Sequence, residues 1–222
     1  MRSFDEILAI AVDRKGNLKP LLNTHGAPKS PNALAAVPDD RWLAMMTRCI
    51  FQAGFNWKVV DNMWPGFEDA FEGFDPGRCE MLNDDDLARL VSDKRIVRNG
   101  RKIRAVQQNA QFVNELAAEH GSAGKFFGGW PAADYIGLLA LLKKRGARLG
   151  GNTGSYFLRF MNVDSFILSK DVTARLIAEG VVDKTPTSQK SLTAVQDAFN
   201  EWQRQSGRSL TEISRILAFS IG

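Results

Sequence analysis

The stretch RLGGNTGSYFLRFM, residues 148–161, decides the fold that we expect. Its turn, Leu149–Gly154, separates two segments with helical patterns, Asp134–Arg145 and Ser155–Met161. Glycine lets a phosphate come close to the backbone, and N–H groups at the start of the next helix can bind its oxygens. The turn is therefore predicted to bind a nucleic-acid backbone through Gly151, Asn152, Thr153 and Gly154. The alternative is an ordinary helix connection whose glycines serve packing.

Positive charge gathers in two runs of the sequence. One run lies between residues 95 and 104, the other between residues 143 and 148. The chain has 222 residues and a formal net charge of +4, which permits nucleic-acid binding but does not establish it. From these runs the predicted backbone contacts are Arg98, Lys102, Lys143 and Arg145.

A second informative segment is CIFQAGFNWK, Cys49–Lys58, in which a helix runs into Ala53-Gly54. An enzyme that acts on a base inside a duplex expels the nucleotide, fills the gap with a wedge and stacks the base on an aromatic ring. Phe55 is the predicted wedge, Trp57 the stacking surface and Gln52 a probe of the opposite strand. The alternative places Phe51, Phe55 and Trp57 in the core, where an isolated aromatic residue usually lies.

The rest of the chain predicts an all-α fold of around ten helices, because no segment alternates with period two between turn signals. Ser3 is expected to cap a helix over residues 3–15, Thr211 a helix over 211–219, and Gly16–Pro38 reads as a loop. The other expected helices cover 39–53, 57–64, 101–119, 134–145, 155–161, 171–177 and 191–205. We expect one two-lobed domain over residues 1–222, with residues 1–38 packing on its core.

Cysteine and histidine usage excludes two classes of protein. Two cysteines are too few for a disulfide scaffold, and Cys49, Cys79, His25 and His120 lack the short spacings of zinc ligands. No window is long and apolar enough for a membrane helix, and the N-terminus does not resemble a signal peptide. We therefore expect a cytoplasmic monomer without metal, cofactor or membrane contact.

Five blocks in one order resemble the 3-methyladenine DNA glycosylase I family of the helix-hairpin-helix glycosylase superfamily. Residues 52–57 match the family's Q-A-G-L-S-W, residues 67–76 its F-x-x-A-F-x-x-F-D-P, and residues 96–103 its I-I-R-N/H-R-x-K-I. Residues 142–146 match L-K-K-R-G, and residues 149–153 match the F-x-G-T-T hairpin. The resemblance covers residues 39–176 and implies a two-lobed helical fold with a helix-hairpin-helix motif.

This chain departs from the family at positions that matter for chemistry. It lacks the R-C-x-W and Y-H-D-x-E-W-G motifs before Asp39 and the zinc ligands near the C-terminus, so the family's zinc site is expected to be absent. The glutamate that reads the flipped base in the family corresponds to Cys49 here. A thiol cannot accept hydrogen bonds as a carboxylate does. The substrate is therefore expected to differ, or turnover to be lost.

The wider superfamily suggests a place for the missing acid. Most of its members have a catalytic aspartate at a helix start about twenty residues after the hairpin, and Asp164 and Asp171 lie in that region. Asp171 is our candidate catalytic residue, although Ser169 aligns at least as well and Asp171 could simply cap its helix. The position of the lyase members' nucleophilic lysine falls near Ser155, which favours a monofunctional enzyme.

The resemblance implies a base-excision-repair enzyme that binds double-stranded DNA and hydrolyses the N-glycosidic bond of an alkylated purine after flipping it. Two alternatives stay open. One is a DNA-binding protein of the same fold without turnover, because of Cys49. The other is a helical protein–protein module with no DNA role.

Overall fold

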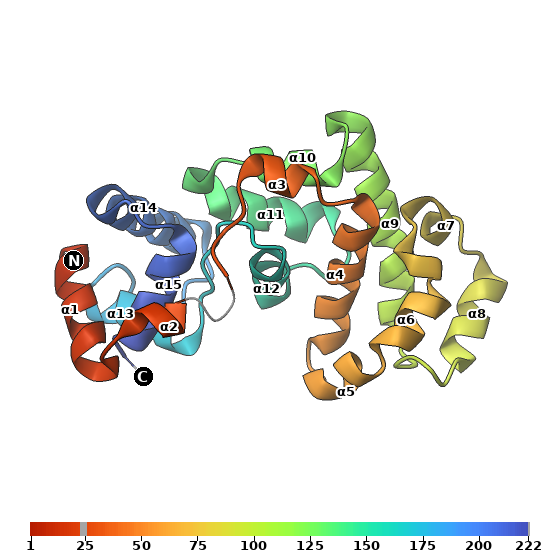
Figure 1. Ribbon diagram of the computed structural model, residues 1–222, viewed down its shortest axis with the longest axis horizontal. Helices are drawn as coiled ribbons and strands as arrows, with labels where there is room; N and C mark the ends of the chain where they lie inside the picture. Colours follow the sequence, from red (N-terminus) through yellow and green to blue (C-terminus); the bar gives the residue numbers. More distant parts are fainter. Residues whose placement is uncertain (23–25, 222) are drawn as a thin grey trace. The chain divides into compact units, whose positions relative to one another are not determined.

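The computed structural model describes residues 1–22 and 26–221, which form helices and no strand (Figure 1). The all-α prediction is confirmed. The chain divides into two compact units. Unit 1 comprises Met1–Lys29, Trp130–Leu138 and Leu158–Gly222, and unit 2 comprises Ser30–Gly129 and Leu139–Phe157. The assignment of all residues to one domain stays a prediction. No helix in the described residues is long and apolar enough to cross a membrane.

Unit 2 is organised around its longest helix, α9, which contacts α4, α7, α8 and α10 (Figure 1). Its helices are α3 (Pro31–Ala35), α4 (Asp39–Gln52), α5 (Trp57–Asn62), α6 (Trp64–Ala70), α7 (Pro76–Glu80), α8 (Asp84–Ser92), α9 (Gly100–His120) and α10 (Ala123–Gly129). It also contains the end of α11 (Tyr135–Arg145) and the start of α12 (Asn152–Phe160). Figure 1 shows α4 beside α9, so the end of α4 and the start of α9 can interact.

Aromatic stacking fills the core of unit 2. Trp42 of α4 stacks on Phe127 of α10, with ring centroids 4.7 Å apart, and Phe51 meets Phe67 edge to face at 4.7 Å. Such pairs stabilise a fold beyond the area that they bury. A Cβ atom at Gly124 would lie 2.4 Å from the carbonyl oxygen of Leu34, so this glycine is what lets α10 approach α3 closely.

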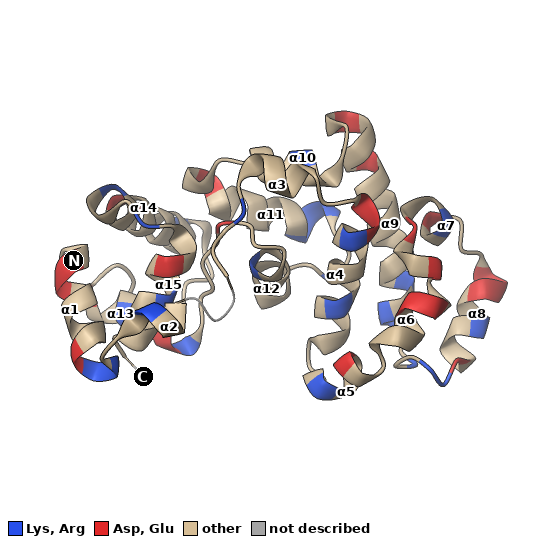
Figure 2. Cartoon of the chain, viewed as in Figure 1, with Lys and Arg blue, Asp and Glu red and all other residues tan. Residues whose placement is uncertain are grey.

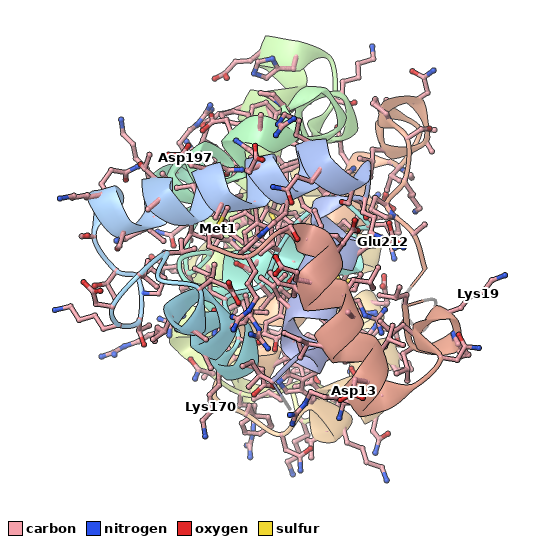
Figure 3. All side chains as sticks on the ribbon, turned by 90° about the vertical axis from the view of Figure 1, so that its left-hand side faces the viewer. Met1, Asp13, Lys19, Lys170, Asp197 and Glu212 are labelled. Carbon is pink, nitrogen blue, oxygen red and sulfur yellow. The ribbon has the colours of Figure 1, made fainter. Side chains whose placement is uncertain are left out.

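Unit 1 packs α15 against α1 and α13 (Figure 3). Its helices are α1 (Phe4–Lys15), α2 (Leu18–Leu22), α13 (Lys170–Ala178), α14 (Gln189–Ser206) and α15 (Leu210–Phe219), with a short 3-10 turn at Ala132–Asp134. In its core, Phe166 stacks on Phe199 at 4.1 Å. The buried guanidinium of Arg175 donates to the hydroxyl and carbonyl oxygens of Ser220, both at 2.7 Å, which ties α13 to the chain beyond α15.

Several predicted boundaries are wrong, each for a local reason. The stretch 16–38 is not only a loop, since it contains α2 and α3; its residues 23–25, including His25, lie outside the described residues. The helix expected over 57–64 ends at Asn62, and Pro65 lies in the first turn of the next helix, α6, where its missing N–H costs nothing. The N-cap of α15 is Ser209, which forms a capping box with Glu212, and not Thr211. The expected cap Ser3 is confirmed, again with a capping box.

Candidate nucleic-acid interface

The loop that follows α4 exposes two aromatic side chains. Helix α4 ends because Gly54 adopts a φ of +67°, and Asn56 then caps α5 by accepting from the amide of Lys58 at 3.0 Å. Phe55 and Trp57 keep 45% and 41% of their surface exposed, although large aromatic residues usually lie inside. We call residues 53–57 the aromatic loop. Both rings are therefore partly exposed to solvent.

The third aromatic residue of this segment has a different role. Phe51 is fully buried and packs on Phe67. The core interpretation therefore holds for Phe51 and not for Phe55 or Trp57.

The glycine-rich turn lies between α11 and α12 and is tighter than the sequence pattern suggests. Helix α12 begins at Asn152 rather than Ser155, so Asn152, Thr153 and Gly154 form its first turn. We call residues 146–151 the hairpin. Arg148 and Gly151 have φ values of +59° and +60°, in the left-handed region.

Glycines serve different purposes in this segment. A Cβ atom at Gly154 would lie 2.4 Å from the carbonyl oxygen of Leu149, whereas one at Gly151 would meet nothing within 4 Å. Gly154 thus lets the first turn of α12 pack on the hairpin, and Gly151 supplies backbone conformation on an exposed surface. The packing alternative is correct for Gly154 and leaves Gly151 open to a ligand.

The start of α12 is suited to an anion. The first N–H groups of an α-helix have no partner within the helix, and the helix dipole adds partial positive charge there. Lys143 and Arg148 flank this end and are exposed. Figure 2 shows Lys and Arg at the end of α11 and along α4 and α9. A phosphate group at this end would meet both N–H donors and positive charge.

Trp57 and Tyr156 join the aromatic loop to the helix of the hairpin. Their rings meet edge to face, with centroids 5.3 Å apart and an interplanar angle of 89°. Trp57 begins α5 and Tyr156 lies in the second turn of α12. The two segments that the sequence singled out therefore lie side by side in unit 2.

A cavity of about 360 Å³ opens between these segments. Its lining residues are Ile50, Ala53, Lys102, Arg148, Gly150 and Thr153. The side chain of Lys102 enters it from α9 and is buried, with Nζ donating to the carbonyl oxygens of Phe51 at 3.1 Å and Ala53 at 2.8 Å. Burial and, second, the charge of Arg148 lower the pKa of the Lys102 ammonium. The ammonium of Lys102 thus binds carbonyl oxygens at the end of α4 and is not exposed at the surface, where a phosphate group would bind.

Two predicted pocket residues are buried in α4. Cys49 keeps 3% of its surface exposed, and burial raises the pKa of its thiol to about 12, so the thiol is neutral near pH 7. Gln52 is buried as well, and its amide donates to Asp61 at 2.9 Å, while its Oε1 atom has no hydrogen-bond partner among the described residues. Gln52 therefore braces α4 against α5, and its role as a probe of the opposite strand stays a prediction.

Of the predicted basic contacts, Arg98 and Lys143 are exposed, but Arg145 is engaged within the protein. Its guanidinium forms ion pairs with Glu115 at 3.1 Å and Glu119 at 2.9 Å, and it lies over the ring of Phe112. These partners neutralise its charge. Arg145 thus fixes the end of α11 on α9.

The candidate catalytic residue Asp171 lies in unit 1, in the first turn of α13. It is not the helix cap, because Ser169 occupies that position and accepts from the amide of Val172 at 3.2 Å. The other aspartate of the region, Asp164, accepts hydrogen bonds from the amides of Leu210 and Thr211. Asp164 therefore holds the start of α15, whereas the side chain of Asp171 forms no hydrogen bond or ion pair with the residues that the structure describes.

Sequence reasoning missed Tyr156 and Asn109. Asn109 of α9 is fully buried, and its side-chain amide pairs with both backbone groups of Ala147, at 3.0 and 2.8 Å. A signal existed, because Lys102 and Asn109 fall in helical register with the apolar positions Val106 and Val113. Polar residues on the buried face of a helix must find partners.

Comparison with solved structures shows the fold. The 8-oxoguanine DNA glycosylase of Methanocaldococcus jannaschii superposes with a TM-score of 0.58 at 13% identity, covering 96% of this chain and 91% of that one. A mutant 3-methyladenine DNA glycosylase I from Staphylococcus aureus gives a TM-score of 0.54 at 20% identity, over 81% of this chain and 98% of that one. The fold is that of the helical DNA glycosylases.

The sequence then indicates the family. Residues 35–135 match the methyladenine glycosylase family. DNA-3-methyladenine glycosylase 1 of Escherichia coli K12 is 35% identical over 60 residues, which are 27% of this chain and about a third, 32%, of that protein. This part of the chain is therefore similar to that family, in the region where three of its sequence blocks lie. The match includes α4, the aromatic loop and the start of α9, whereas the hairpin lies beyond it.

Proposed function

We propose that this chain is a monofunctional DNA N-glycosylase that removes an alkylated purine, of the 3-methyladenine type, from double-stranded DNA. The observation that carries the proposal is the contact between Trp57 and Tyr156, which joins an exposed aromatic loop to a hairpin suited to phosphate. A flipped base needs an aromatic platform close to a grip on the strand that carries it.

In the proposed mechanism the first turn of α12, which follows the hairpin, binds a DNA phosphate together with Lys143 and Arg148. These contacts do not depend on the base sequence of the DNA. Phe55 enters the stack in place of the expelled nucleotide, and the base stacks on Trp57. An alkylated purine carries positive charge, so it leaves readily as the bond to the sugar breaks. Water adds to the sugar carbon and loses a proton, and Asp171 stabilises the developing positive charge and orients that water.

A second candidate is a DNA-binding protein of the same fold without turnover. The observation that favours it is the buried, neutral thiol of Cys49 at the position where the family has a base-reading carboxylate. This candidate predicts binding to damaged DNA without release of the base.

Two measurements separate these candidates. A gel-shift assay with duplex DNA containing an abasic analogue tests binding, and chromatography of alkylated DNA after incubation tests base release. The proposal expects binding, release by the wild type and slower release by Asp171→Asn with unchanged binding. Binding to DNA without release of a base supports the second candidate. Absence of binding excludes both candidates and favours a helical protein–protein module.

A further inference from the structure

Helix α9 contacts both segments of the candidate interface through polar side chains on its buried face. Lys102 and Asn109 are seven residues apart, which places them two turns apart on the same side of the helix, about 10 Å along its axis. Both are buried, with 7% and 0% of their surface exposed. A buried polar group needs hydrogen-bond partners, because burial without them costs free energy.

The contact made by Lys102 completes the end of α4. The last carbonyl groups of a helix lack partners within it, and a cation is favoured at that end. The ammonium of Lys102 binds two of these oxygens, those of Phe51 and Ala53, immediately before Phe55 and Trp57. The residue therefore fixes where the aromatic loop leaves α4.

The contact made by Asn109 fixes the hairpin. Its Nδ2 donates to the carbonyl oxygen of Ala147 at 3.0 Å, and its Oδ1 accepts from the amide of Ala147 at 2.8 Å. Both backbone groups of one turn residue are thereby satisfied by one side chain. The next residue, Arg148, adopts the left-handed conformation that directs the chain toward α12.

We propose that Lys102 and Asn109 are positioning residues that hold the aromatic loop and the hairpin at a fixed spacing on α9. The role of that spacing rests on the proposed function, since wedge and phosphate grip must engage one DNA strand together. The cavity between the segments supports it, because Lys102, Ala53 and Arg148 line its walls. Neither residue touches the flipped base in this scheme.

Hydrogen exchange of the whole protein without DNA tests the positioning itself. Asn109→Ala is expected to speed amide exchange in residues 147–153 by about tenfold or more, with residues 51–58 unchanged, because a buried hydrogen-bonded pair is lost. Lys102→Met is expected to speed amide exchange in residues 51–58 and to leave residues 147–153 unchanged. Helix α8 serves as the internal control, and Lys102→Arg, which can still donate to both carbonyls, is expected to restore wild-type exchange at residues 51–58.

DNA binding tests the consequence. Asn109→Ala is expected to weaken binding to undamaged and abasic-analogue duplexes by the same factor, since the hairpin contacts only backbone. Lys102→Met is expected to reduce only the preference for the abasic analogue. If the wild type binds no DNA, the proposed function is wrong. The hydrogen-exchange experiment still tests whether Lys102 and Asn109 hold their two segments in place.

The inference is overturned if each variant loosens both segments and α8 alike, since the residues would then be ordinary core. It is also overturned if neither segment responds. Asn109→Ser, a milder change, repeats the test should Asn109→Ala fail to fold; the expected result is the same local pattern at residues 147–153.

Discussion

The indole of Trp57 meets the phenol ring of Tyr156 edge to face, with centroids 5.3 Å apart. One ring begins α5 and the other lies in α12, ninety-nine positions further along the chain. An edge-to-face pair of this kind leaves part of the indole exposed, here 41% of Trp57. The hairpin helix thus contacts the ring, and part of the ring stays exposed to solvent.

Replacement of this ring tests the stacking role. Trp57→Ala is expected to slow base release by about 10- to 100-fold, because stacking on an aromatic side chain contributes about 1–3 kcal/mol per base. Single-turnover release from alkylated duplex DNA measures the effect. Val59→Ala, which removes a side chain of similar exposure from the same helix, is the matched control and should stay near wild type. Equal rates for both variants would remove Trp57 from the site.

Charge at the hairpin tests the phosphate grip. Gly151→Asp is expected to weaken duplex binding by about tenfold at 0.1 M salt, because a carboxylate would repel the phosphate. Gly151→Asn is the control. Asn and Asp both tolerate the left-handed conformation of this position, and their side chains differ mainly in charge. Affinity is measured by fluorescence anisotropy over a salt series. If the Asp and Asn variants bind alike, the hairpin does not bind the DNA backbone.

The packing role of Gly154 predicts a loss of stability. A Cβ atom there would lie 2.4 Å from the Leu149 carbonyl oxygen, so Gly154→Ala is expected to lower the free energy of unfolding by about 1–3 kcal/mol. Urea unfolding followed by circular dichroism measures it. Gly129→Ala, at an open position of α10, should not destabilise the protein. Equal stabilities of the two variants would refute the close packing.

The two thiols predict a pattern of reactivity and of pH dependence. Burial raises the pKa of both Cys49 and Cys79 to about 12, so the native protein is expected to resist a thiol reagent at pH 8 and to react fully after denaturation. In the unfolded chain both thiols lose their protons near the ordinary cysteine pKa of 9.0, at lower pH than in the folded chain. Stability should therefore fall as pH rises from about 9 toward 12. Rapid labelling of Cys49 in the native state would contradict its burial.

The helical fold could be predicted from sequence, but the state of individual side chains could not. Helical periodicity and caps such as Ser3 gave the α-helices, because these signals are local. The burial of Gln52, Lys102 and Cys49 depends on how α4, α5 and α9 pack together, and no local pattern encodes that packing. Lys102 reads as a surface cation and is in fact a buried donor to α4.

The start of α12 shows the same limit. Asn152–Gly154 read as loop because Gly and Asn are poor helix formers. The close approach of Gly154 to Leu149 makes them the first turn of the helix. A local contact across the turn overrides the helix propensity of the single residues there, which places the N–H groups of the turn at a helix start.

Release of free base from alkylated duplex DNA is the decisive test of the proposed base excision. The wild type and Trp57→Ala are incubated with DNA methylated in vitro, and free bases are separated by chromatography while the strands are checked on a denaturing gel. We expect free 3-methyladenine with uncut strands for the wild type, and much less free base for Trp57→Ala. Absence of any free methylated base with the folded wild-type protein would contradict it.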